Sequence, residues 1–191
     1  MSAAQDLAHL LLSTAAGFFL AVIWLRFLLQ YLSADFYNPV SQWVEWVSRP
    51  VLQPLRKALP RSTRFDWAAL VMIVMIKTLE LTLYSAMEFH QIIPFVQLMF
   101  TAFYALAVQL LYFYQGMLIL LMIMSWVVAA GGYHPLYALL LELSEPLCAP
   151  ARKILPPVAG IDFSLMLVFF ALQILQVVVQ HVFLSLGAML L

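Results

Sequence analysis

The second half of this chain repeats the first half at a constant offset of 96 positions, from Tyr37 to Tyr133 and from Asp66 to Asp162. Ten residues keep their identity across that offset, and no insertion or deletion separates them. They are Tyr37, Pro39, Ser48, Pro50, Pro54, Arg56, Lys57, Leu59, Pro60 and Asp66, which recur as Tyr133, Pro135, Ser144, Pro146, Pro150, Arg152, Lys153, Leu155, Pro156 and Asp162. An unbroken register over a stretch rich in proline and charge indicates an internal duplication, so the chain should build one arrangement twice.

The composition predicts an integral membrane protein. Hydrophobic residues make up 65% of the chain and charged residues 9%, whereas soluble domains are about one quarter charged. The mean hydropathy is +1.00. Four apolar runs are long enough to cross a bilayer, which needs roughly 20 helical residues. They are Ala8–Leu32, Trp67–Met87, Ala105–Ala130 and Phe163–Leu186. Because lipid offers the backbone no hydrogen bonds, these runs should be helices, and the predicted fold class is all-α with four transmembrane helices.

The segment Ile92–Tyr104 leaves the number of spans open, because it is apolar but contains Pro94. It can be a fifth span, or an interfacial or re-entrant lead-in to the third. A fifth span would put Arg56-Lys57 and Arg152-Lys153 on opposite sides of the membrane, whereas four spans put both pairs on the cytoplasmic side. We therefore predict four spans, with both termini outside the cytoplasm. No basic residue precedes the first run, which should be a retained span.

Four spans make each repeat one helix, one connecting element and one returning helix. An even number of spans per repeat makes the two repeats parallel, related by a pseudo-two-fold axis along the membrane normal. We predict residues 1–90 as the first repeat and residues 91–191 as the second.

The repeated connector is typical of an amphipathic helix at the lipid boundary. In Ser41–Leu59 the apolar residues follow helical spacing, while glutamine, glutamate, serine and basic residues fill the other positions. Pro50 and Pro54 remove backbone donors and should break this helix into two pieces. The second copy, Leu136–Leu147, is more apolar and suits an interfacial or re-entrant segment better than a span.

Polar residues mark the expected helix starts. Asn38-Pro39 and His134-Pro135 precede the two connectors, and Asp66 and Asp162 directly precede the second and fourth spans. An aspartate at the positive end of a helix dipole explains both acids as helix caps. The alternative is a catalytic or ion-binding role for these two carboxylates.

The basic pairs of the connectors are candidate contacts for lipids or partners. Arg56, Lys57, Arg152 and Lys153 can bind anionic lipid headgroups, at about 1 kcal/mol per charge near the surface. The alternative is that they only set the topology. The partners expected are the lipid bilayer, its anionic headgroups, and membrane proteins or further copies of this chain. No nucleic acid is expected, because the connectors are too short and too broken by proline to form a broad basic face.

Polar side chains also recur inside the second and fourth spans. They are Lys77, Glu80 and Tyr84 and, at the same offset, Gln173, Gln176 and Gln180. Each set of three shares one helical face. A charge near the bilayer centre costs roughly 2.5–3.5 kcal/mol, so these groups should face protein, water or each other. One interpretation is a seam between the repeats that passes or coordinates ions or protons. The alternative is hydrogen bonding and an ion pair that hold the helices together.

Arg26 lies within the first apolar run, near its cytoplasmic end. A long basic side chain in this position can reach the headgroups while its aliphatic part stays in lipid. We therefore expect Arg26 to point out to the headgroups and to have no further role.

No residue pattern predicts catalysis, a metal site or a cofactor. Cys148 is the only cysteine, and the four histidines show no metal-ligand spacing. The sequence contains no phosphate-binding glycine loop and no G-x-S-x-G or H-E-x-x-H motif. We therefore expect a protein that is not an enzyme.

The repeated phrase resembles the YggT family of small integral membrane proteins. The first copy reads Asn38-Pro39, Arg49-Pro50, Pro54-Leu55-Arg56-Lys57, Leu59-Pro60 and Asp66, and the second reads His134-Pro135, Glu145-Pro146, Pro150, Arg152-Lys153, Leu155-Pro156 and Gly160-Ile161-Asp162. With their helices, the two copies cover nearly the whole chain. The first copy departs from the family pattern at Arg49, where an acidic residue is usual, and at Ser62-Thr63-Arg64, which replaces a glycine-rich approach to the aspartate.

The resemblance implies a bacterial inner-membrane protein, with relatives in photosynthetic organelles and no settled biochemical activity. Members of the family have been linked to osmotic-stress tolerance, cell division and the assembly of membrane complexes. We therefore expect a non-enzymatic scaffold or assembly factor that presents its two connectors at the cytoplasmic face. The alternative is transport of potassium or protons, or osmotic-stress adaptation, through the intramembrane seam.

Overall fold

The computed structural model describes residues 3–60, 62, 64–88, 93–156 and 162–190, and all regular structure within them is helical. The helices are α1 (Ala3–Tyr31), α2 (Pro39–Ala58), α3 (Trp67–Glu88), α4 (Phe95–Ala129), α5 (Pro135–Ile154) and α6 (Ser164–Leu190). Four of them, α1, α3, α4 and α6, are long and apolar enough to cross a membrane. The predicted all-α fold class with four spans is therefore confirmed. The predicted boundary between the repeats, at residues 90 and 91, lies outside the described residues.

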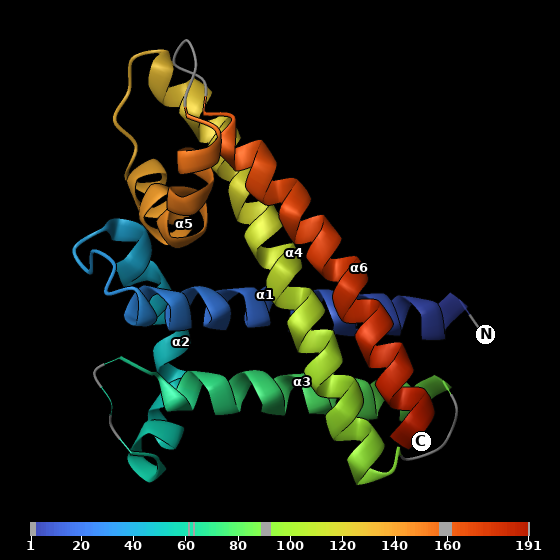
Figure 1. Ribbon diagram of the computed structural model, residues 1–191. Coiled ribbons are helices and arrows are strands. Elements are labelled where there is room, and N and C mark those ends of the chain that lie inside the picture. Colours follow the sequence, from blue (N-terminus) through green and yellow to red (C-terminus); the bar gives the residue numbers. More distant parts are fainter. Residues whose placement is uncertain (1–2, 61, 63, 89–92, 157–161, 191) are drawn as a thin grey trace.

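Each repeat is a long helix, a short helix with internal prolines, and a second long helix. Figure 1 shows α1 beside α3 and α4 beside α6, with the two pairs inclined to one another. The short helices α2 and α5 lie toward one end of the long helices, and the N- and C-termini lie toward the other end (Figure 1). Helices α1 and α4 each run from the end that carries a terminus toward the end that carries a short helix, although the two helices are steeply inclined to one another (Figure 1).

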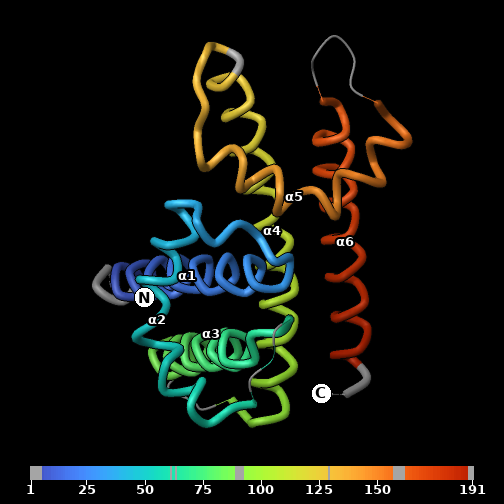
Figure 2. Tube along the Cα trace, turned by 90° about the vertical axis from the view of Figure 1, so that its left-hand side faces the viewer, coloured from blue at the N-terminus to red at the C-terminus, as the bar shows by residue number. Residues whose placement is uncertain are grey.

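The two repeats meet mainly through α4. In Figure 2, α4 lies between the α1/α3 pair and α6, and it packs against both α3 and α6. One hydrophobic core joins α1, α2 and α3 around Leu20, Ile23 and Ile73. A second core joins α4, α5 and α6 to α1 and α2, with Leu118 and Leu143 at its centre. The outward faces of the spans remain apolar, as contact with lipid requires.

Helix α4 resolves the question that Pro94 raised. Pro94 is the N-cap of α4, which runs without a break from Phe95 to Ala129. Residues 95–104 are therefore the first turns of the third span, and the prediction that this span begins at residue 105 was wrong. These turns pack along the end of α6, where the rings of Phe100 and Tyr104 each lie 5.2 Å from the ring of Phe183. Tertiary packing thus extends a helix that the local composition alone placed at the interface.

The short helices are amphipathic, as predicted, but their prolines do not break them. Pro50 and Pro54 lie inside α2, and Pro146 and Pro150 lie inside α5. The buried face of α2 consists of Ser41, Val44, Ser48 and Leu52, and α5 buries the matching positions Leu140, Ser144 and Cys148. Each proline removes one backbone hydrogen bond, whereas burial of the whole apolar face stabilises the helix around it.

Both predicted connector starts are confirmed. The Asn38 side chain accepts a hydrogen bond from the Val40 N–H at 2.9 Å, and the ring Nδ1 of His134 accepts one from the Leu136 N–H at 3.2 Å. The proline after each cap supplies the fixed φ that the first helical turn needs. These caps set where α2 and α5 begin, and hence where their basic ends lie.

Candidate functional site

The same arginine–aspartate pair anchors the short helix in each repeat. In the first repeat, Arg56 Nη2 lies 2.5 Å from Asp66 Oδ2, and in the second, Arg152 Nε lies 2.9 Å from Asp162 Oδ2. Each arginine is in the last turn of its short helix. Asp66 directly precedes α3, and Asp162 is separated from α6 by one residue. The pair therefore fixes the end of the short helix to the start of the span that follows it.

Both aspartates also bond to the first turn of the following span. Asp66 Oδ1 accepts a hydrogen bond from the Ala69 N–H at 3.2 Å. Asp162 Oδ1 accepts one from the Ser164 N–H at 3.0 Å and one from the Ser164 hydroxyl at 2.5 Å. Each carboxylate thus uses one oxygen at the helix start and the other on its arginine.

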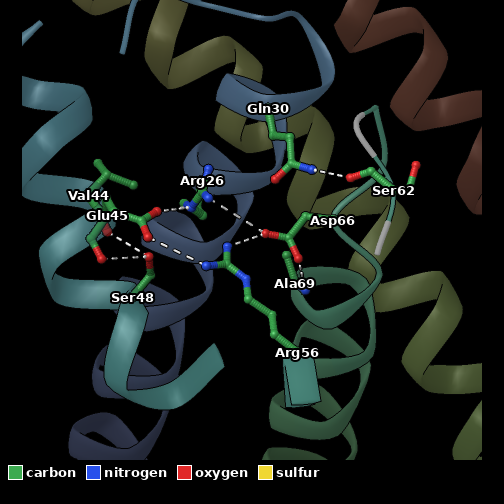
Figure 3. A network of polar contacts seen from close by, with 9 residues as sticks. All are labelled: Arg26, Gln30, Val44, Glu45, Ser48, Arg56, Ser62, Asp66 and Ala69. Carbon is green, nitrogen blue, oxygen red and sulfur yellow. Dashed lines mark hydrogen bonds and ion pairs between the residues drawn. The ribbon is translucent and has the colours of Figure 1, made fainter. Parts of the chain in front are cut away.

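In the first repeat this pair belongs to a four-residue network, shown in Figure 3. Arg26 Nε lies 2.6 Å from Glu45 Oε2, and Arg56 Nη1 lies 3.5 Å from Glu45 Oε1. Arg26 Nη2 also lies 3.9 Å from Asp66 Oδ2. The two cations and two anions alternate and neutralise one another, and together they join α1, α2 and the start of α3.

Arg26 does not point out to the headgroups, so that expectation was wrong. Its side chain is 13% exposed, and the Asp66 side chain is 4% exposed. A guanidinium held between two carboxylates forms strong charge-assisted bonds, which outcompete exposure to headgroups. Sequence reasoning also missed Glu45, because neither residue has a charged counterpart at the repeat offset.

The second repeat holds its arginine differently. Arg152 Nη1 lies 2.5 Å from Glu145 Oε2, so Arg152 bridges Glu145 and Asp162. The positions that match Arg26 and Glu45 are Met122 and Leu141, and both pack against the hydrophobic core. The second cluster therefore contains one cation and two anions, and apolar contacts replace the extra ion pair. The preceding Gly160-Ile161 lies outside the described residues.

Burial and ion pairing act in opposite directions on the pKa values of Arg56 and Asp162. Burial lowers the pKa of Arg56, but the bonds to Asp66 and Glu45 raise it more, so that it lies above the usual value. Burial likewise raises the pKa of Asp162, but the Ser164 hydroxyl and Arg152 lower it further, to below the usual value. Both groups therefore stay charged throughout the neutral pH range.

The four predicted lipid or partner contacts separate into two kinds. Arg56 and Arg152 are engaged in ion pairs within their own repeats, whereas Lys57 and Lys153 are exposed. The spacing of ten residues from arginine to aspartate, kept in both copies, was the signal that these arginines have an internal partner. The two lysines are therefore the members of this set that remain available to other molecules.

The two short helices contact each other across the repeats. The Asn38 amide Nδ2 donates a hydrogen bond to the Pro135 carbonyl at 2.7 Å, and the Asp35 N–H donates one to Glu142 Oε2 at 3.1 Å. Asn38 is buried. These bonds connect the start of α2 to α5 at one end of the molecule.

The six intramembrane polar residues lie in separate contacts. Lys77 Nζ and Glu80 Oε2 are 2.9 Å apart along α3, and the ring of Tyr84 packs 4.6 Å from the ring of His9 on α1. On α6, Gln173 and Gln180 are exposed, while Gln176 Nε2 donates to Gln115 Oε1 on α4 at 3.3 Å. In the part of the chain that the structure describes, Lys77 and Glu80 form no hydrogen bond or ion pair with the three glutamines.

A polar cavity of about 460 Å³ opens beside the first-repeat network. Its polar lining comes from α1, α2 and the turn before α3, and consists of Arg26, Gln30, Arg49, Gln53, Arg56, Lys57, Ser62 and Asp66. Gln30 Nε2 donates to the Ser62 carbonyl at 3.1 Å and so connects α1 to that turn. Among the described residues, no group of three or more histidine, cysteine, aspartate or glutamate side chains is arranged to hold a metal ion.

Comparison with known proteins gives the same division into two copies. The CCB3/YggT family model matches residues 5–87 and 99–183, one segment in each repeat. An uncharacterised protein of Pseudomonas aeruginosa is 35% identical over 170 residues, which are 88% of this chain and 86% of the relative. The uncharacterised protein YggT of Escherichia coli K12 is 34% identical over 182 residues, 95% of this chain and 93% of the relative.

A protein of Vibrio alginolyticus is 32% identical over 167 residues, which are 85% of this chain and 88% of the relative. No solved structure matches the chain. Both repeats fall within the family match, and the relatives are covered over most of their length. The chain is therefore a multi-pass membrane protein that belongs to the CCB3/YggT family.

Proposed function

We propose that this protein is a non-enzymatic scaffold or assembly factor of the bacterial inner membrane, which presents α2 and α5 to partner proteins at the cytoplasmic face. One observation carries the proposal: two short helices, each fixed to its own spans by an arginine–aspartate pair, are bonded to each other at one end of the molecule. A surface that is fixed at three places keeps its side chains in register, and this preorganisation favours the binding of a partner.

The side chains that this surface leaves free are of the kinds that interfaces use. Trp46 is 75% exposed on α2, and Lys57 and Lys153 are exposed at the ends of the two short helices. Exposed tryptophan anchors are enriched at the centres of protein interfaces. Basic residues at the rim favour encounter with an acidic partner.

The charge distribution supports a cytoplasmic orientation for α2 and α5. Seven of the nine lysine and arginine residues fall in the two connectors, at Arg49, Arg56, Lys57, Arg61, Arg64, Arg152 and Lys153. Short loops rich in lysine and arginine remain on the cytoplasmic side during insertion. With four spans, both termini are then periplasmic.

Site-specific photo-crosslinking in native membranes tests the proposal. A photoreactive amino acid at Trp46 should give a discrete adduct with a partner protein, whereas the same probe at Leu184, which is 65% exposed on α6, should react mainly with lipid. The double substitution Lys57→Gln and Lys153→Gln should abolish the adduct while insertion is kept.

Glu88→Gln is the matched control, because it changes a charge at the opposite end of α3 from the connectors. An adduct at Trp46 that survives the double lysine substitution unchanged, or is lost equally in the Glu88 variant, would count against a partner site on this surface.

A further inference from the structure

Two of the four cations that line the first-repeat cavity form no ion pair with the described residues. In the network, Arg26 and Arg56 are neutralised by Glu45 and Asp66. Arg49 and Lys57 line the same cavity, and neither forms an ion pair within the described part of the chain. The cavity therefore carries an excess of two positive charges at neutral pH.

These two cations lie on one stripe of α2. Arg49, Gln53 and Lys57 are four residues apart, so all three side chains are on the same helical face, and all three line the cavity. The stripe supplies guanidinium, amide and ammonium donors in sequence. Guanidinium, ammonium and amide N–H groups are the donors that a phosphate group requires, and the Asp66 carboxylate in the same lining is already paired with Arg56.

The cavity lies beside the ends of two apolar spans, where the phosphate groups of a bilayer are expected. Its walls come from the end of the span Asp6–Tyr31 and from the start of the span Trp67–Glu88. The rings of Phe65 and Trp67 stack 5.8 Å apart beside it, and aromatic side chains gather where a span leaves the hydrocarbon. A volume of about 460 Å³ is within the range that binds small ligands.

We propose that this cavity binds the phosphate group of one anionic phospholipid, with Arg49 and Lys57 as its cationic ligands and Gln53 as an amide donor. The network of Arg26, Glu45, Arg56 and Asp66 is the fixed wall of this site. We assign the phosphate to a lipid because the cavity lies at the ends of two spans. A membrane phospholipid presents its phosphate at this level while its acyl chains stay in the hydrocarbon.

The second repeat does not carry the same site. At the matching stripe it has Glu145, Ala149 and Lys153, and Glu145 is already bonded to Arg152. A cavity of about 570 Å³ in the second repeat is lined mainly by apolar residues such as Met122, Trp126 and Leu141, and the three stripe residues are not part of its lining. We therefore expect one phosphate site per chain rather than two.

The test is retention of labelled lipid by the purified full chain in neutral detergent. Phosphatidylglycerol is the anionic probe, phosphatidylcholine the zwitterionic probe, and inorganic phosphate the competitor. Wild-type protein should retain one phosphatidylglycerol. Arg49→Gln with Lys57→Gln should weaken that binding about 25-fold, or about fivefold for each cation, since about 1 kcal/mol per basic residue corresponds to that ratio.

Lys153→Gln is the matched control in the second repeat and should leave binding within about twofold of wild type. Arg49 and Lys57 are exposed, so their replacement should leave elution and helical content unchanged. Wild-type retention in the double variant, an equal loss in Lys153→Gln, or equal retention of phosphatidylcholine would overturn the site.

Displacement of the lipid by inorganic phosphate at equal concentration would overturn the assignment to a lipid headgroup. The inference concerns the same face of the molecule as the proposed partner surface, but its test contains no partner protein. Loss of the crosslinked adduct and loss of lipid retention are separate readouts, so each idea can fail alone.

Discussion

The two repeats solve the same anchoring problem with different side chains. Both hold an arginine of the short helix against the aspartate that begins the next span. The first repeat adds Arg26 and Glu45 to that pair, whereas the second has Met122 and Leu141 at the matching positions. An ion pair and a well-packed apolar pair of similar size can contribute equally to stability, because desolvation offsets most of the Coulomb attraction. The shared arginine–aspartate pair is therefore the part of the arrangement that the fold needs.

The largest difference between the repeats should appear when each aspartate is removed. Asp66→Ala should lower the free energy of unfolding by about 3 kcal/mol, because the Asp66 side chain is 4% exposed and its loss leaves the largely buried Arg26 and the partly buried Arg56 with one carboxylate. Asp162→Ala should lower it by only about 1 kcal/mol, because the Asp162 side chain is 26% exposed and Glu145 still pairs with Arg152. Denaturant titration in mixed micelles measures both, with the exposed Asp6→Ala as control. Equal losses at the two sites would contradict the comparison.

Copying the second repeat into the first tests whether the extra pair is interchangeable with apolar packing. Arg26→Met alone and Glu45→Leu alone should each lower the free energy of unfolding by about 2 kcal/mol, because each leaves a partly buried charge without its partner. The double variant should be within about 1 kcal/mol of wild type, since both charges are gone and the new pair matches Met122 and Leu141. A double variant that loses the sum of the two single effects would show that the first repeat needs its charges.

The response of stability to acid should report on the cluster in the second repeat. The folded pKa of Asp162 lies below 3.8, so the unfolded chain binds a proton there more readily than the folded chain does. The stability that Asp162 contributes is thus complete above the unfolded pKa and is lost as the pH falls through the folded pKa. The free energy of unfolding, measured from pH 6 to pH 3, should show this loss in wild type. Asp162→Asn should make the free energy of unfolding depend less on pH over the same range. If the free energy of unfolding of Asp162→Asn depends on pH as strongly as that of wild type, groups other than Asp162 cause the loss of stability in acid.

The smallest difference concerns the intramembrane polar groups at matching positions. Glu80 pairs along its own helix with Lys77, whereas Gln176 bonds across to Gln115. Gln176→Leu should lower the free energy of unfolding by about 0.6 kcal/mol, the average for a hydrogen bond between spanning helices. Gln173→Leu, at an exposed position of the same helix, is the control and should have a smaller effect. The transport alternative stays a prediction, and flux of potassium or protons through protein-containing liposomes, compared with Lys77→Leu, tests it.

The helices and the number of spans followed from local features of the sequence. They are the long apolar runs, the caps at Asn38 and His134, and the concentration of basic residues in the connectors. Two predictions failed where distant contacts decide. Pro50 lies inside an intact α2 because the buried face holds the helix, and residues 95–104 extend α4 because they pack on Phe183.

The site was less predictable, because charged residues were interpreted one at a time. Arg56 and Arg152 recur with their aspartates at a fixed spacing of ten, and this shared spacing would have pointed to the pairs that the separate interpretation of each residue missed. Arg26 and Glu45 belong to different helices and occur in only one repeat. The match between the two copies therefore gives no sign that they form a pair. A network whose members come from three elements becomes visible only when those elements are placed together.

The bond between Asn38 and Pro135 has a consequence for how the chain is made. Asn38 completes its contacts only when a carbonyl 97 positions later is present. At a synthesis rate of about 5–20 residues per second, the ribosome needs roughly 5–20 seconds to deliver that residue. During this interval the Asn38 amide lacks the Pro135 carbonyl as its partner. The two halves are therefore joined late in synthesis. A chain that stops after its first repeat would lack the bond between Asn38 and Pro135 that connects the two short helices.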